Sequence, residues 1–120
     1  MEGFVKYPCD LNEHLNDTII VSGILSGCME YEWFDLLEKD NCSDDFQMDL
    51  DYNSVELTNS IEKRLNKIQD CAASMKLVLK GVLRKEKDSI YGHLGSNTAE
   101  FEILKFMNYG SVKYKKLKPQ

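Results

Sequence analysis

The sequence predicts a mainly β fold with a single helix, in the order strand, strand, strand, helix, strand, strand. Two observations lead to this prediction. In several short segments apolar residues recur at every second position, which is typical of strands with one buried face. In one segment after residue 55 they recur at every third or fourth position, which is typical of a helix with one buried face.

Three strands are expected before the helix. Residues 18–25 are rich in β-branched side chains and are followed by a glycine-containing turn and a second strand at 29–36, so that the two pair as a hairpin. A polar loop at 38–45 separates this hairpin from residues 46–51, where apolar and polar side chains alternate strictly. Gly23, within the first strand, indicates a bend or a bulge.

The helix and two further strands follow. Leucine and isoleucine residues spaced by three or four predict a helix over about 55–73, with Ser54 or Thr58 as its N-terminal cap. The period then changes to two in a strand at 75–84, and again in a last core strand at 99–107.

The length of 120 residues indicates one domain, residues 1–120. We expect residues 1–16 to form an irregular N-terminal arm, residues 17–108 to form the core, and residues 109–120 to form a basic tail that pairs briefly before fraying. Hydrophobic residues make up 42% and charged residues 29%, which is ordinary for a soluble globular protein and argues against disorder.

This order of elements is that of the OB-fold, a five-stranded, partly open barrel whose helix lies between strands three and four. Gly23 and Gly81 lie where the strongly coiled strands of a small barrel need bends. A five-stranded α+β sheet with the helix packed on one face gives the same order and remains an alternative.

The segment before the last strand resembles that of a known group of proteins. The turn Tyr91-Gly92-His93-Leu94-Gly95 precedes an alternating strand and follows Leu79-Lys80-Gly81-Val82-Leu83. These residues resemble a group of small bacterial OB-like proteins, in which such a turn leads into the final strand and a V-x-G-x-L strand precedes it. The hairpin from Gly23 to Cys42 is similar too. The resemblance implies the OB-like fold. Many members of the group look like exported proteins or lipoproteins, the group has no assigned activity, and no functional residue carries over.

The four cysteines, Cys9, Cys28, Cys42 and Cys71, lack the spacing of a zinc motif. The N-terminus has neither the basic nor the apolar region of a secretory signal, so we expect a cytoplasmic protein with free, buried thiols. The alternative is a periplasmic protein whose leader has been removed. In that case we expect a disulfide between Cys28 and Cys42.

Charges are divided along the chain. Residues 1–62 carry fifteen acidic and two basic side chains, a formal charge of −13, whereas residues 63–120 carry a formal charge of +8. Crowded like charges weaken the folded state, but they also steer oppositely charged partners. Aromatic side chains supply anchors at such interfaces. We therefore predict a protein-binding face composed of Glu30, Glu32, Trp33, Asp35, Glu38, Asp40, Asp44, Asp45, Asp49 and Asp51. The alternative is an ordinary solvated acidic surface, with Trp33 in the core.

Other kinds of site have weaker support. His93 is the best candidate for an acid–base residue, but a glycine-rich turn explains the same residues. The aspartates of the polar loop lack the spacing of a calcium loop, and no phosphate-binding glycine motif is present. Strand carboxylates repel nucleic-acid phosphates. We therefore expect no enzymatic activity, no cofactor, no bound metal, and no nucleic-acid or membrane partner.

The predicted face indicates a function in protein binding. Bacterial toxin-neutralising immunity proteins are often small, acidic and enzymatically inert, and the chain is similar to them in type, without a shared motif. We predict an immunity-type protein that binds and occludes a basic toxin. A nuclease is the expected partner, because its active site holds phosphates whose place carboxylates can take. The alternative is an OB-like domain of an exported or envelope protein with a small-ligand or structural role.

Overall fold

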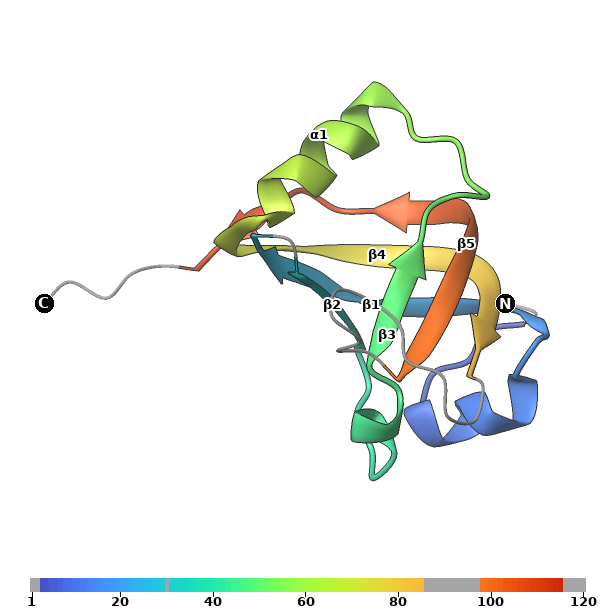
Figure 1. Ribbon diagram of the computed structural model, residues 1–120. Coiled ribbons are helices and arrows are strands. Elements are labelled where there is room, and N and C mark those ends of the chain that lie inside the picture. The colour runs from blue at the N-terminus through green and yellow to red at the C-terminus, as the bar shows by residue number, and fades with distance from the viewer. Residues whose placement is uncertain (1–2, 30, 86–97, 116–120) are drawn as a thin grey trace, which may run out of the picture.

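The computed structural model describes residues 3–29, 31–85 and 98–115. These residues form a mainly β structure with one α-helix (Figure 1). The strands are β1 (Thr18–Cys28), β2 (Tyr31–Leu36), β3 (Met48–Asp51), β4 (Asp70–Arg84), β5 (Ala99–Tyr109) and β6 (Lys113–Tyr114). The helices are α1 (Asn59–Ile68) and two 3-10 helices, η1 (Pro8–His14) and η2 (Ser43–Asp45).

Five of the strands form a closed ring. β1 pairs with β2, β2 with β3, β3 with β5, β5 with β4, and β4 returns to β1; the β3–β5 pairing is parallel and the others are antiparallel. The predicted fold class, mainly β with one helix, is confirmed. The predicted order of elements is not matched in full, because the two-residue strand β6 pairs with the beginning of β4 and two 3-10 helices are also present.

Two glycines lie where the strands of the ring approach each other most closely. A Cβ atom at Gly23 would overlap the carbonyl oxygen of Asp35 on β2, and one at Gly81 would overlap that of Glu102 on β5. Gly81 also follows a register shift between β4 and β5. Because only glycine leaves this space free, these two positions let strongly coiled strands close the ring.

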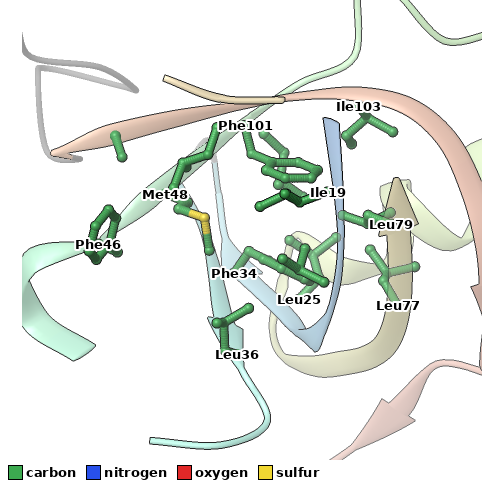
Figure 2. Packing of buried hydrophobic residues seen from close by; sticks show 14 of the residues in the cluster. Ile19, Leu25, Phe34, Leu36, Phe46, Met48, Leu77, Leu79, Phe101 and Ile103 are labelled. Carbon is green, nitrogen blue, oxygen red and sulfur yellow. The ribbon is translucent and has the colours of Figure 1, made fainter. Parts of the chain in front are cut away.

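The hydrophobic core fills the inside of the ring. Inward-facing side chains from successive strands pack against one another there (Figure 2). The alternation predicted for residues 46–51 and 75–84 is confirmed, since every second side chain in these segments is buried. The largest fully buried side chains include Phe34, Phe101, Leu25, Leu77 and Leu79.

Helix α1 lies over one end of the ring and is shorter than predicted (Figure 1). Thr58 caps it, because its Oγ1 accepts a hydrogen bond of 3.3 Å from the Ile61 N–H. The predicted continuation to residue 73 is wrong, since the chain pairs with β1 from Asp70 onward. Cys71 has a φ of 67°, which an α-helix does not allow. Tertiary pairing therefore overrides the apolar spacing that predicted a longer helix.

The N-terminal segment is more ordered than predicted. Residues 1–16 were expected to be irregular, but η1 lies within them and its Leu11 is fully buried. The backbone N–H of Val5 donates to the carbonyl oxygen of Ile20 at 2.9 Å, which holds the segment along β1. η1 and η2 lie beside each other at the end of the ring away from α1 (Figure 1).

Two disulfides hold the two ends of the ring. Cys9–Cys42 joins η1 to the loop before η2, and Cys28–Cys71 joins the end of β1 to the start of β4. The predicted free thiols and the alternative Cys28–Cys42 bond are both wrong. The six-residue strand β2 separates Cys28 from the loop that contains Cys42, and this corresponds to roughly 20 Å of extended chain. In the chain-entropy description, loops closed over 33 and 43 residues stabilise the fold by about 4 kcal/mol each.

Candidate partner-binding face

Four carboxylates lie together on the outer face of β3 and β5. The parallel pairing places Asp49 opposite Glu100 and Asp51 opposite Glu102. Directly opposite residues point to the same side of a sheet, and the alternate positions of both strands are buried in the core. Like charges in this arrangement repel each other. We call these four residues the acidic sheet cluster.

One arginine pairs with this cluster. Arg84 Nη2 lies 2.6 Å from Glu102 Oε1, and the Ser54 hydroxyl donates a hydrogen bond of 2.5 Å to Glu102 Oε2. The Ser54 hydroxyl and then Arg84 hold the pKa of Glu102 below its usual value. Within the described residues, no other carboxylate forms an ion pair with a lysine or an arginine.

Two other members of the cluster, Asp49 and Glu100, have pKa values above their usual values. Burial raises the pKa of Asp49, and the neighbouring Asp51 raises it further. Burial also raises the pKa of Glu100, and Asp51 and Asp49 add to this against the smaller opposing effect of Arg84. At neutral pH both negative charges are therefore held at a cost in folding free energy, which a positively charged group on this face would reduce.

Glu32 lies near the cluster, but on the inner side of β2, and is partly buried. Its side chain lies on the same side of β2 as the buried Phe34, and its Oε1 accepts a hydrogen bond of 2.9 Å from the Tyr52 hydroxyl. Burial raises the pKa of Glu32 against the lowering effect of this hydrogen bond, and Asp49 raises it further. Burial and the adjacent Glu32 also raise the pKa of Tyr52, so the phenol remains the hydrogen-bond donor.

Trp33 lies on the outer side of β2. Phe34 pairs with Met48 of β3 and both are buried, so the neighbouring residues Trp33, Asp35 and Asp49 face outward. The Trp33 side chain is 43% exposed and stacks on Tyr31 at a ring-centroid distance of 6.3 Å. The alternative in which Trp33 belongs to the core is therefore wrong. An exposed tryptophan near unneutralised carboxylates has the character of an interface anchor.

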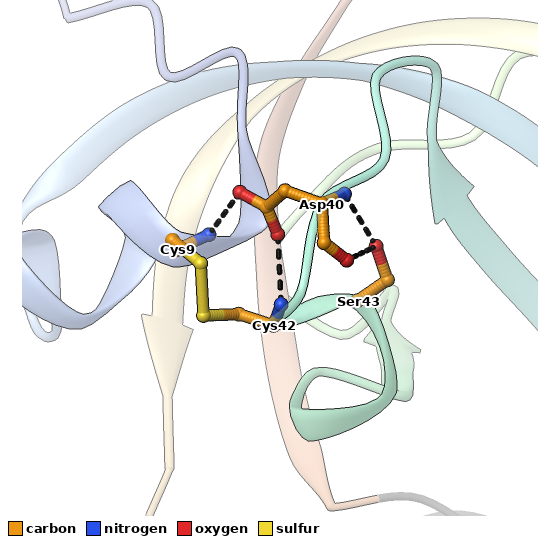
Figure 3. Close-up of a disulfide and its surroundings, with 4 residues drawn as sticks. All are labelled: Cys9, Asp40, Cys42 and Ser43. Atoms are coloured by element: carbon orange, nitrogen blue, oxygen red, sulfur yellow. Dashed lines mark hydrogen bonds between the residues drawn. A yellow bond between two sulfur atoms is a disulfide. The ribbon is translucent and has the colours of Figure 1, made fainter.

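Asp40 forms several hydrogen bonds within the protein, and its predicted part in partner binding stays a prediction (Figure 3). Its Oδ2 accepts a hydrogen bond of 3.0 Å from the Cys9 N–H, and its Oδ1 accepts one of 2.9 Å from the Cys42 N–H. The Ser43 hydroxyl donates to the Asp40 carbonyl oxygen at 2.9 Å. Asp40 therefore holds the loop and the adjacent disulfide. Cys9, Asp40 and Cys42 are the only potential metal-ligand group in the described part of the chain, but the disulfide occupies both sulfur atoms.

The remaining predicted residues lie beyond the cluster. Asp35, Glu38 and Asp44 line a surface hollow at the end of β2. The Asp45 side chain is exposed, while its carbonyl oxygen accepts hydrogen bonds from Lys85 Nζ and the Thr98 hydroxyl. Glu30 lies outside the described residues, and so does the Tyr91–Gly95 turn with His93. The predictions for these residues stay untested.

Sequence reasoning missed two carboxylates of the cluster, Glu100 and Glu102. They belong to the basic half of the chain, where the regional net charge conceals them. The signal that reveals them is local: both occupy the polar positions of an alternating strand, and β3 carries aspartates at its own polar positions.

Comparisons with protein families, curated proteins and solved structures find no match. Within the described ranges, no helix has the length and apolar character needed to cross a membrane.

Proposed function

We propose that this protein is a non-enzymatic binding protein that recognises a positively charged protein through the acidic sheet cluster and Trp33. One observation carries the proposal: β3 and β5 hold Asp49 and Asp51 in register with Glu100 and Glu102, against one paired arginine. The like charges of such a face repel each other and so raise the free energy of the unbound fold. A cationic surface that docks there removes part of this repulsion.

We also propose that the ring of strands is an OB-fold. The helix lies between β3 and β4, and the order β1-β2-β3-β5-β4 closes back onto β1, which supports this assignment. In OB-folds the face of strands two and three is a binding face. Here that face bears Trp33, Asp35 and Asp49, a composition that disfavours phosphate backbones and favours cationic protein surfaces.

The partner class that we favour is a bacterial toxin with a basic surface or active site, which makes the protein immunity-type. Carboxylates of the cluster would occupy the place of negatively charged substrate groups, and a nuclease is one toxin with such a site. The two disulfides support a non-reducing compartment. We therefore propose that the protein acts after export and meets its partner outside the cytoplasm.

The binding proposal is tested with two charge-reversal variants of equal net charge. Asp49→Lys/Glu100→Lys alters the cluster, whereas Glu13→Lys/Glu62→Lys alters two exposed residues on η1 and α1. Wild type and the second variant are expected to capture the same basic protein from the envelope fraction of the native host. The cluster variant should associate with it about tenfold more slowly at low salt. Equal association rates for the two variants would contradict the proposal.

The compartment is tested by thiol alkylation. Protein isolated from the native host under denaturing, non-reducing conditions is treated with iodoacetamide and weighed by mass spectrometry. We expect no alkylated cysteine before reduction and four afterwards, because all four form disulfides. Four alkylated cysteines before reduction would show that the protein resides in a reducing compartment.

A second candidate function is an envelope domain that binds a small ligand. A hollow of about 220 Å³ that the exposed Trp33 lines favours it, because Ser26, Ser74 and Lys115 line the same hollow and offer polar contacts. Its volume suits a ligand smaller than those of most small-molecule sites. This function predicts ligand binding that survives Asp49→Lys/Glu100→Lys but is lost in Trp33→Ala, as measured by calorimetry with ligands extracted from the host envelope.

A further inference from the structure

The hollow at the end of β2 combines an apolar floor with an acidic rim. Its volume is about 150 Å³. The floor consists of the buried residues Leu36, Phe46 and Met48, each less than 7% exposed. Two exposed carboxylates of the rim come from the connection between β2 and β3: Glu38 lies near its start and Asp44 lies in η2.

We propose that this hollow receives a single lysine or arginine side chain of the protein partner. The inference rests on the proposed function for the class of partner, and it adds the position and chemistry of an anchor site. Lysine and arginine combine an apolar stem with a cationic head. The stem fits the floor of Leu36, Phe46 and Met48, and the head meets the carboxylates of the rim.

The size of the hollow agrees with one side chain. Small-molecule sites usually have volumes of about 300–1,000 Å³, and this hollow has about half the lower value. A wholly apolar side chain would gain nothing from the charge of the rim carboxylates, and an acidic one would be repelled by them. The hollow therefore selects for a long side chain with a positive end.

The charge balance of the rim favours a cation even though one lysine lines the hollow. Asp35, Glu38 and Asp44 face a single ammonium group, that of Lys39. In the part of the chain that the structure describes, Lys39 forms no ion pair. Two of the three negative charges therefore remain uncompensated by a lining residue.

The wall of the hollow is fixed before any partner arrives. Pro8 and Leu11 of η1 contribute to the lining, and the Cys9–Cys42 disulfide fastens η1 to the loop that carries the rim. Ser43, another lining residue, is held by its hydrogen bonds with Asp40. A preformed wall loses less conformational entropy when a side chain enters.

The experiment uses the methyl group of Met48 as a reporter, because it belongs to the floor. Capped single residues are titrated into protein with ¹³C-labelled methionine methyls at low salt: N-acetyl-arginine amide, N-acetyl-lysine amide, and the neutral N-acetyl-citrulline amide. We expect saturable Met48 shifts with the first two, with dissociation constants of about 1–10 mM. Met75, in the core away from the hollow, should not shift.

Two variants with the same change in net charge separate the effect of the rim carboxylates from that of the net charge of the protein. Glu38→Gln/Asp44→Asn should weaken arginine-amide binding about fivefold, whereas Glu13→Gln/Glu62→Gln should leave it unchanged. Equal binding of citrulline and arginine amides, equal effects of the two variants, or no saturable shift up to about 50 mM would overturn the proposal. A micromolar affinity for free arginine amide would also overturn it, because the hollow would then be a small-molecule site.

The same variants distinguish this inference from the proposed function. If Glu38→Gln/Asp44→Asn releases the captured partner about fivefold faster, the anchor is supported. If only Asp49→Lys/Glu100→Lys affects capture, the anchor is wrong and the proposed function stands. If the hollow binds arginine amide but capture of the partner is unchanged in Asp49→Lys/Glu100→Lys, the proposed function fails instead.

Discussion

Asp40 and Asp49 carry the same functional group in the same acidic half of the chain, yet their surroundings are opposite. The two oxygens of Asp40 accept hydrogen bonds from the Cys9 and Cys42 backbones, so its charge stabilises the loop. Asp49 lies across from Glu100 and near Asp51, so its charge destabilises the strand pair. Whether a carboxylate remains available to a partner depends mainly on the hydrogen-bond donors around it. The density of acidic residues in the sequence matters less.

The largest expected effect is at Asp40. Asp40→Ala leaves two backbone N–H groups near the disulfide without their acceptor, and we expect a loss of about 2–4 kcal/mol in the free energy of unfolding. Asp44→Ala, in the same loop but exposed, should change it by less than about 0.5 kcal/mol. Urea unfolding at pH 7 with intact disulfides measures both. Similar losses in the two variants would show that the hydrogen bonds of Asp40 do not stabilise the loop.

A smaller effect of opposite sign is expected at the acidic sheet cluster. Asp49→Asn/Glu100→Gln removes two like charges that lie directly opposite each other, and we expect a gain of about 1 kcal/mol. Glu13→Gln/Glu62→Gln removes the same number of charges from exposed sites elsewhere and should gain nothing comparable. The same urea experiment applies. A loss of stability in the cluster variant would mean that these carboxylates hold the strands together.

The smallest effect is on the pH dependence of stability. Glu32, Asp49 and Glu100 have raised pKa values, so the folded state binds their protons more tightly than the unfolded state. Stability therefore rises as the pH falls from 7 through these raised values. Glu102 acts in the opposite sense, because its lowered pKa makes stability fall below its ordinary value of 4.5.

Urea unfolding at pH 7 and at about pH 5 tests this balance. We expect the wild type to be more stable at the lower pH, and the difference to shrink in Asp49→Asn/Glu100→Gln. A wild type that is less stable at the lower pH would place the dominant titration elsewhere in the molecule.

The sequence predicts the class of fold well because strand alternation is a local property. The buried positions of residues 75–84 follow from their period of two, and Thr58 follows from the capping preference of helices. The end of the helix and the disulfide partners do not follow in the same way. They depend on β1 meeting β4, which brings Cys28 beside Cys71 across 43 residues of chain.

For the same reason, the candidate site can be predicted only in part from the sequence. The carboxylates of β3 stand out in an acidic segment, and their outward direction follows from alternation with Met48 and Leu50. Their pairing with Glu100 and Glu102 requires a parallel contact between strands that lie far apart in the sequence. The hydrogen bonds of Asp40 cannot be predicted from the sequence either, because their backbone donors come from residues that only the folded loop brings together.

The parallel contact between β3 and β5 also determines the order in which parts of the fold can form. A chain synthesised from its N-terminus contains all four cysteines before β5 is made, so β3 has no neighbour on that side until synthesis has passed Ala99. Rings that close through distant segments assemble slowly, on the order of milliseconds to seconds. All four cysteines are therefore present in the chain, and able to pair, before the last strand closes the ring.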